Sequence, residues 1–248
     1  MKINIIKSFV LAAALCLPSA ALAQMPPLSE GSVFSVEDSN GEIFYEVVDE
    51  ANFTCQVWND SQDLNRYQGD IVVPSTVKYW DYEYTVTGVG EGGFRDCQNL
   101  HSVKLPSTVT SLGLAAFARC PKLVSVEFSS VTAIPDYAFS ECPNLTDVSM
   151  PEILTSIGEG AFEDCTSLTG IAIPDGVKEL RKKTFYGCTL LADVTLSSSL
   201  TSIGETAFYD CKSLTGITIP NSVVSIGQWA FSGCMSLAEA TLSSHSPR

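Results

Sequence analysis

The sequence has few of the residues on which catalytic and metal sites usually depend. Its 248 residues include only two histidines, His101 and His245, and neither belongs to a nucleophile–base pattern. The cysteines never occur with C-x-x-C spacing, and the glycines recur with the repeat instead of forming a phosphate-binding loop. We therefore expect a protein that is not an enzyme and that uses no metal or other cofactor.

Basic residues are also scarce. The chain has 14 lysines and arginines against 28 aspartates and glutamates, which gives a formal net charge of −14. Nucleic acids and anionic lipid surfaces are bound largely through positive charge, so both are poor partners for this chain. Solubility is sufficient to explain the acidic net charge, because a net charge far from zero keeps an exported repeat protein in solution.

No apolar run is long enough to cross a membrane. The apolar segment Phe9–Leu17 follows the positive charges of Lys2 and Lys7 and precedes Ala21-Leu22-Ala23. This order of a basic, an apolar and a small-residue segment is typical of a secretory signal peptide.

We expect residues 1–23 to be removed by cleavage before Gln24, so that the protein is exported. The sequence leaves open whether it stays in the periplasm, reaches the cell surface or is secreted. Cys16 offers an alternative, lipidation, which the bulky Leu15 before it disfavours.

One repeated pattern fills most of the chain. Seven cysteines from Cys97 to Cys234 follow one another at intervals of 22 or 23 residues, each with a phenylalanine three residues before it and a leucine three residues after it. This period with L-x-x-V-x-L is typical of a leucine-rich repeat solenoid. One coil cannot enclose its own apolar side chains, so stacked coils must bury them as interior ladders. The predicted structural ladder includes Phe117, Phe139, Phe162, Phe185, Phe208, Cys120, Cys142, Cys165, Cys188 and Cys211.

Each coil is expected to contain two short extended pieces and one helical turn. A V-x-I segment closed by proline predicts a strand, because proline cannot donate to a β-ladder. A second extended piece such as Leu154–Gly158 ends in a glycine that suits a sharp corner. The Ala-Phe-x-x-Cys segment is expected to form a helical or 3₁₀ turn. The predicted fold class is therefore an α+β repeat solenoid, a right-handed superhelix of short β-strands and short helical or 3₁₀ turns.

The chain divides by composition into a leader, a cap and the repeats. Residues 24–31 are expected to be a flexible leader, and residues 32–87 a β-rich N-terminal cap that covers the open end of the solenoid. Residues 88–242 would form about seven coils, and residues 243–248 a tail. No polar capping repeat is visible after Leu242, so we expect the last coil either to fray or to associate end to end with another copy.

The cap is expected to contain two hairpins. Residues 43–48 and 52–57 alternate between apolar and polar side chains, which predicts a β-hairpin. Residues 78–85 are expected to form a second hairpin inserted into the first coil, with Trp80 near its tip.

The redox state of the cysteines can be argued from the repeat. Eight cysteines would remain after cleavage, and an even number in an exported chain suggests disulfides. Neighbouring coils lie about 5 Å apart, however, slightly more than the roughly 3.5–4.5 Å that a disulfide requires between Cβ atoms. We favour a reduced, buried ladder, and leave the state of Cys55 open because it lies outside the repeat.

The segment Ile157–Pro174 reads I-G-x-x-A-F-x-x-C-x-x-L-x-x-I-x-I-P, and this pattern resembles the BspA-type leucine-rich repeat. The resemblance extends over about Ile71 to Leu242. It implies a leucine-rich repeat fold, and the family includes adhesins and proteins that bind matrix or host proteins. Arg181–Phe185 departs from the Gly-x-x-Ala-Phe form.

The predicted strands present outward side chains between each buried apolar pair and one position before it, and these side chains are small, hydroxylated and mildly acidic. Outward positions alternate with the buried apolar pairs. Aromatic residues cluster instead in the N-terminal region, where they serve either as cap core or as a binding patch: Trp58, Tyr67, Tyr79, Trp80, Tyr82 and Tyr84. The candidate binding surface comprises Lys104, Glu127, Ser149, Thr195, Thr218, Thr241, Asp147, Asp193, Trp80 and Tyr82.

Three functions follow as alternatives. The first, implied by the family resemblance, is a non-enzymatic exported protein that binds a protein or extracellular-matrix partner and mediates adhesion. The second is a glycan-capture module, which the lack of aromatic residues on the strand face disfavours. The third is a structural unit that assembles with itself through its last coil.

Overall fold

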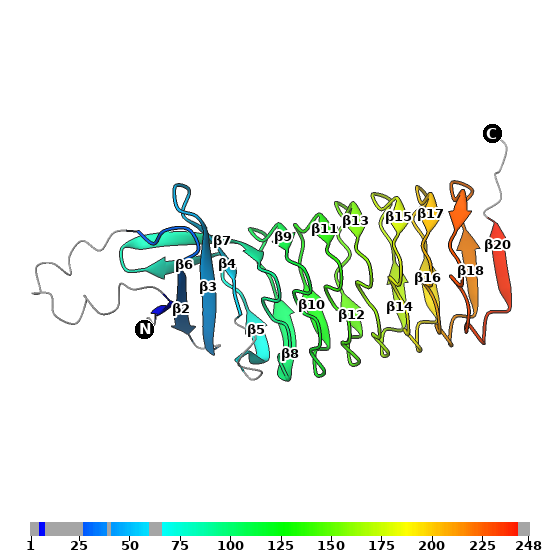
Figure 1. Cartoon of the computed structure of the whole chain (residues 1–248), viewed down its shortest axis with the longest axis horizontal. Helices are drawn as coiled ribbons and strands as arrows, with labels where there is room; N and C mark the ends of the chain where they lie inside the picture. Colours follow the sequence, from blue (N-terminus) through cyan, green and yellow to red (C-terminus); the bar gives the residue numbers. More distant parts are fainter. Residues whose placement is uncertain (1–4, 8–26, 39–40, 60–65, 243–248) are drawn as a thin grey trace, which may run out of the picture.

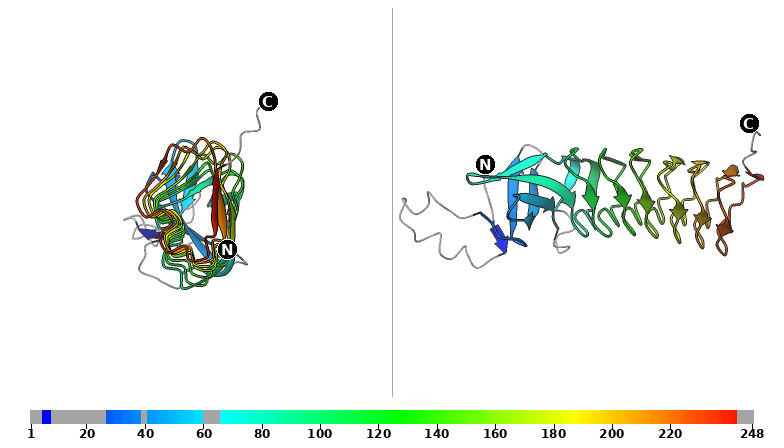
Figure 2. Two further views of the ribbon diagram at one scale, coloured as in Figure 1. Left: turned by 90° about the vertical axis from the view of Figure 1, so that its right-hand side faces the viewer. Right: turned by 90° about the horizontal axis from the view of Figure 1, so that it is seen from above.

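The polypeptide winds into a long rod of stacked coils, with a larger sheet at its N-terminal end (Figure 1). The computed structural model describes residues 5–7, 27–38, 41–59 and 66–242. Seen along the rod, the coils share one outline and lie over one another (Figure 2). The apolar interior of each coil is therefore covered by its neighbours, as the repeat requires.

The sheet at the N-terminal end contains seven strands in the full chain, of which β1 lies within residues 1–23, the predicted signal peptide. Its order is β1-β2-β3-β4-β7-β6, and β9 joins it by pairing with β7, so this sheet runs directly into the solenoid. The six strands that precede the solenoid are β1 (Ile5–Lys7), β2 (Val33–Asp38), β3 (Gly41–Asp49), β4 (Thr54–Val57), β6 (Thr76–Tyr79) and β7 (Tyr82–Val89).

Both predicted hairpins are confirmed. Strands β3 and β4 pair antiparallel, as do β6 and β7, and the second hairpin begins two residues earlier than predicted. Tyr79 is paired with Tyr82, so Trp80 and Asp81 form the two-residue tip. The predicted apolar run of the signal peptide and its cleavage site lie outside the described residues, as does the predicted tail 243–248.

The coils contribute two stacks of short parallel strands. The first stack carries the predicted outward side chains, and we call its exposed side the strand face. It consists of β5 (Gln68–Val72), β8 (Asn99–Lys104), β10 (Ser125–Glu127), β12 (Asp147–Val148), β14 (Gly170–Ala172), β16 (Asp193–Thr195), β18 (Gly216–Ile219) and β20 (Glu239–Leu242). The second stack consists of β9 (Ser111–Leu112), β11 (Ala133–Ile134), β13 (Ser156–Ile157), β15 (Glu179–Leu180), β17 (Ser202–Ile203) and β19 (Ser225–Ile226).

The predicted helical turns are wrong: the described residues contain no helix, and the fold is a β-solenoid of about seven turns instead of an α+β solenoid. In each turn, the residue before the Ala-Phe-x-x-Cys segment and the residue before its cysteine have left-handed backbone angles, such as Gly160 at φ 56° and Asp164 at φ 58°. Left-handed residues interrupt a right-handed helix. The segment also bonds outward, because the Phe162 N–H donates to the Thr184 carbonyl of the next coil at 2.9 Å.

Phenylalanine rings form a continuous file through the interior. Each pair of neighbouring rings from Phe94 to Phe231 is stacked, with centroids 5.1–5.4 Å apart and planes within 16° of each other. All of these rings except Phe231 are fully buried. The file holds neighbouring coils in register, because each ring has one partner on either side.

The cysteines run beside the rings as free thiols. Each thiol donates a hydrogen bond to the backbone carbonyl of the phenylalanine one coil earlier, as Cys165 does to Phe139 at 3.1 Å. The same bond recurs from Cys120 to Cys234 at 2.9–3.2 Å. All eight cysteines in the described residues are free. The thiol therefore satisfies a buried carbonyl and does not serve as a cross-link.

The glycine that follows the second strand permits close contact between coils. A Cβ added to Gly158 would lie 2.3 Å from the Asp136 backbone nitrogen, closer than any side-chain atom can approach. A larger residue would push the two coils apart at this corner.

Candidate binding surface

The strand face presents outward side chains at alternate positions of each strand, such as Asp193 and Thr195 on β16. Lys104 and Glu127 are exposed and form an ion pair between neighbouring strands at 3.0 Å. Further along the stack, the hydroxyls of Thr218 and Thr241 lie 3.3 Å apart. Asp147, Asp193 and Thr195 are also exposed, and Ser149 is half-buried. The predicted residues of the strand face thus lie in two neighbouring rows along the solenoid, one with Asp147 and Asp193 and one with the remaining side chains.

The sheet beneath these rows is interrupted twice. Strands β5, β8, β10 and β12 pair in one sheet, β14 pairs only with β16, and β18 pairs only with β20. Between β14 and β16, the Ala192 N–H donates to the Thr169 carbonyl of the preceding coil at 2.9 Å. Thr169 and Thr215 occupy the equivalent position at the two breaks, and within the described coils their N–H groups make no such bond. Both interrupted strands begin with glycine, Gly170 and Gly216, and glycine weakens a strand because it offers no side chain to pack.

Each interruption opens a groove on the strand face. The larger groove, of about 410 Å³, lies over the break between β12 and β14. Its apolar lining includes Val148, Met150 and Ile171, which are half-buried, whereas the corresponding Val103 and Val126 in the continuous sheet are each 1% exposed. A second groove of about 280 Å³ lies over the break between β16 and β18.

The two grooves carry negative charge at their edges. The larger is lined by Asp147, Glu152 and Asp175, and the smaller by Asp193 and Glu239. No lysine or arginine lines either groove. Asp175 accepts two hydrogen bonds from Ser198, at 2.8 and 2.9 Å, and these bonds lower the pKa of its carboxyl group.

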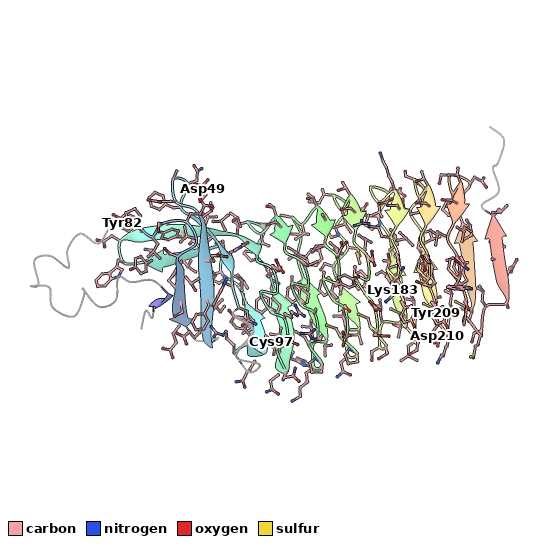
Figure 3. All side chains as sticks on the ribbon, in the orientation of Figure 1. Asp49, Tyr82, Cys97, Lys183, Tyr209 and Asp210 are labelled. Atoms are coloured by element: carbon pink, nitrogen blue, oxygen red, sulfur yellow. The ribbon has the colours of Figure 1, made fainter. Side chains whose placement is uncertain are left out.

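The second candidate patch lies on the N-terminal hairpin. Trp80 is 47% exposed at the hairpin tip, and its backbone is left-handed at φ 55°. Tyr82 is half-buried and stacks on Phe53, with ring centroids 5.7 Å apart. Figure 3 shows Tyr82 at the N-terminal end of the rod, where β6 and β7 belong to the N-terminal sheet, whereas the grooves of the strand face lie between β12 and β18. The structure therefore does not bring Trp80 and Tyr82 together with the strand face of the repeats.

The repeats also carry exposed aromatic residues that the sequence analysis missed. Tyr137 and Trp229 are 37% and 58% exposed, and the half-buried Tyr186 and Tyr209 stack on each other with ring centroids 5.0 Å apart. All four belong to the turns around the ladder phenylalanines, and we call this side of the solenoid the turn edge. They occur two residues before or one residue after a ladder phenylalanine, and that recurrence was a signal in the sequence.

Charged groups on the turn edge pair across coils. Lys183 donates to Glu163 at 2.8 Å and lies 5.2 Å from the Tyr186 ring centroid. The bond to Glu163 raises the pKa of the Lys183 amine. Burial, together with the charges of Glu163 and Glu141, raises the pKa of the nearby Asp164 carboxyl. The cations of this edge thus already have partners.

The thiols are poor candidates for chemistry. Burial raises the pKa of the Cys188 thiol far above its ordinary value and that of Cys55 to about 12. A thiol is nucleophilic or binds a metal only as the thiolate, so these groups are inert at neutral pH. Over the described residues no group of histidine, cysteine or carboxylate side chains could hold a metal ion. That same part of the chain offers no helix able to span a membrane.

Comparisons with known proteins agree with this architecture. The chain matches the family model of the BspA type leucine rich repeat region, in six copies over residues 75–191 and 156–247. It is similar to the solved structure of a leucine rich cell surface protein from Faecalibacterium prausnitzii A2-165, with 31% identity and a TM-score of 0.70. That match covers 86% of this chain and 55% of the other, so the chain spans about half the length of that protein.

A leucine rich repeat protein from T. pallidum is also similar, with 26% identity and a TM-score of 0.52, over 68% of this chain and 86% of that one. A comparison with curated proteins gives no match.

Proposed function

Because the chain belongs to the BspA-type leucine-rich repeat family, we propose that it is an exported, non-enzymatic protein that binds a protein partner through its strand face. The partner we propose is a protein of a host or matrix surface, and the role is adhesion. The similar protein from F. prausnitzii is described as a cell surface protein, which supports a location outside the cytoplasm.

The observation that carries this proposal is the strand face itself. It consists of rows of exposed side chains on short parallel strands, with one new set of side chains for each coil. Such a surface is extended and regular, and repeat proteins use extended surfaces to bind other macromolecules. Its C-terminal half also retains two grooves and carboxylates without an ion-pair partner in the described residues, so it offers contacts that the chain does not use internally.

Site-specific photo-crosslinking tests the proposal. A photoreactive residue at Thr218 on β18 would face the partner, and one at Ser225 on β19 provides the control, because both residues are exposed but lie in different stacks. After incubation with surface and matrix proteins, we expect crosslinked protein only from Thr218. Equal capture from both positions, or none from Thr218, would refute binding through the strand face.

A second candidate function is glycan capture by the N-terminal hairpin, which the exposure of Trp80 favours. An exposed tryptophan can stack on a sugar ring, whereas the strand face offers no aromatic side chain for this purpose. Binding on a glycan array that is lost in Trp80→Ala and retained in Asp81→Asn would support this function. The absence of binding to any glycan on the array would refute glycan capture by the hairpin.

A further inference from the structure

We propose that the two grooves of the strand face are sockets for long basic side chains, lysine or arginine, carried by an extended segment of the partner protein. This inference rests on the proposed function and specifies the chemistry of the partner. It is carried by the shape of the grooves, by their charge and by a contrast within the strand face itself.

The groove between β12 and β14 has an apolar floor and an acidic edge. Val148 and Ile171 form part of the floor, and Asp147 and Glu152 lie at the edge. Lysine and arginine combine a long apolar stem with a charged end group, so the stem can lie on the floor while the end group reaches the carboxylates. Neither a purely apolar side chain nor a carboxylate would fit both parts.

The interrupted sheet adds uncharged acceptors to the socket. Where the sheet is continuous, the Val124 N–H donates to the His101 carbonyl at 2.8 Å, and the next coil repeats this bond from Thr146 to Val124 at 3.0 Å. Across the break, no described N–H donates to the Thr146 carbonyl, because the bond from Thr169 is absent. An ammonium or guanidinium group can donate several hydrogen bonds and accepts none, so it suits a site of carbonyls and carboxylates.

In the N-terminal half of the strand face, a lysine of the chain itself pairs with an outward carboxylate. There the chain supplies its own lysine, because Lys104 on β8 bonds to Glu127 on β10 at 3.0 Å. In the C-terminal half, the positions corresponding to Lys104 are Ala172, Thr195 and Thr218, which carry no charge. None of the ion pairs found among the described residues includes Asp147, Glu152, Asp193 or Glu239.

The spacing of the sockets limits the partner segment. The grooves lie two coils apart and share Thr195 in their linings. Successive rings of the phenylalanine file in this part are 5.4 Å apart, so two coils correspond to about 11 Å. Residues three apart in a polyproline II segment lie on one side at about 9 Å, and flexible lysine side chains can span the small difference.

Fluorescence anisotropy with the full chain tests the inference. The probe is a labelled proline-rich peptide with two lysines three residues apart, and the matched peptide carries norleucine, which keeps the stem and lacks the charge. We expect the lysine peptide to bind and its affinity to fall with added salt. Binding of the norleucine peptide with equal affinity would overturn the inference, because the charge would then be irrelevant.

Variants locate the binding. We expect Asp147→Asn with Glu152→Gln to weaken binding of the lysine peptide about fivefold, since two partly exposed ion pairs are lost. The control, Glu50→Gln with Asp81→Asn, makes the same change in net charge on the exposed hairpin loops and should leave the affinity unchanged. An equal loss in both double variants would show attraction by overall charge only and would refute the sockets.

A third variant supplies the cation within the chain. Ala172 lines the larger groove and is exposed, so Ala172→Lys should place an amine in the socket and block the peptide, whereas Ala172→Gln should not. Equal affinity of the lysine peptide for the Ala172→Lys and Ala172→Gln variants would contradict the inference. If no peptide binds although Thr218 still crosslinks a protein, the sockets are refuted and the proposed function stands. If Thr218 captures nothing either, the proposed function falls as well.

Discussion

Removing one ring from the middle of the phenylalanine file should divide the solenoid into two halves that unfold separately. Phe162 is fully buried and stacks on two neighbours, with centroids at 5.3 Å on one side and 5.4 Å on the other. Phe162→Ala removes both contacts and leaves a cavity in an interior that cannot collapse, because the backbone of each coil is bonded to the next. A loss of this kind costs about 3–5 kcal/mol.

Phe231→Ala is the matched control. Phe231 is half-buried and stacks within the described file only on Phe208, at 5.3 Å. We therefore expect about half the cost, roughly 1.5–2.5 kcal/mol. In a linear array each coil is stabilised by its nearest neighbours, so a defect in the middle uncouples the two sides while a defect near the end does not.

Urea unfolding followed by far-ultraviolet circular dichroism and by hydrogen exchange would distinguish the two variants. For Phe162→Ala we expect two transitions, with the amides on the C-terminal side of coil 162 losing protection first. For Phe231→Ala we expect one main transition at a slightly lower urea concentration. The reasoning is refuted if both variants lose the same stability, or if Phe162→Ala costs less than about 1 kcal/mol.

Three further predictions concern the thiols, one glycine and the last described coil. The buried thiols have raised pKa values in the folded state, with Cys55 at about 12 against an ordinary value of 9.0. The free energy of unfolding should therefore be constant below about pH 9 and fall above it, because the thiols of the unfolded chain ionise first. Urea unfolding between pH 7 and 11 that shows no such fall would contradict this prediction. Gly187→Ala should destabilise the protein, since its φ is 73° and the new Cβ would lie 2.0 Å from an Asp164 carboxylate oxygen; thermal unfolding unchanged from the parent would contradict the close contact. Val224 and Met235 are 87% and 80% exposed, so we expect the protein to self-associate with rising concentration in sedimentation velocity. The double variant Val224→Glu with Met235→Glu should abolish this association. A strict monomer of the parent protein at all concentrations would refute the prediction.

The interior of this protein is readable from its sequence because the repeat places each ladder residue at the same point of every coil. Spacings of 22 or 23 residues between cysteines are sufficient to predict that Phe139, Phe162 and Phe185 meet, and their rings do stack. The hairpin with Trp80 at its tip could likewise be predicted, since period-two alternation flanks the short Trp80-Asp81 turn.

The turn conformation could not be read in the same way. Ala-Phe-x-x-Cys has acceptable helix formers, and glycine marks the left-handed positions in only some coils, such as Gly160 and Gly187. At the position that Gly160 occupies in its coil, Lys183 and Thr206 take the left-handed angle in the next two coils, at φ 57° and 52°. Bonds to the next coil stabilise this conformation, and such bonds depend on the stacked structure instead of local preference.

The outward composition of the strand face was predictable, but its interruptions were not. Gly170 and Gly216 occupy ordinary positions of the repeat, and nothing in the pattern shows that the preceding strand no longer pairs there. The exposed aromatic residues of the turn edge were missed for a related reason. Tyr137 and Trp229 each lie two residues before a ladder phenylalanine in sequence, but the structure leaves them exposed.

Amide hydrogen exchange at the two breaks tests the central structural claim, that the strand face is open in its C-terminal half. The Thr169 and Thr215 amides face a neighbouring coil without the bond that Ala192 and Ala238 make at the same position, at 2.9 and 3.1 Å. We predict that Thr169 and Thr215 exchange at least about a hundredfold faster than Ala192 and Ala238, because an amide without an acceptor needs no local opening. Equal protection of all four amides would show a continuous sheet, and would contradict both the grooves and the sockets built on them.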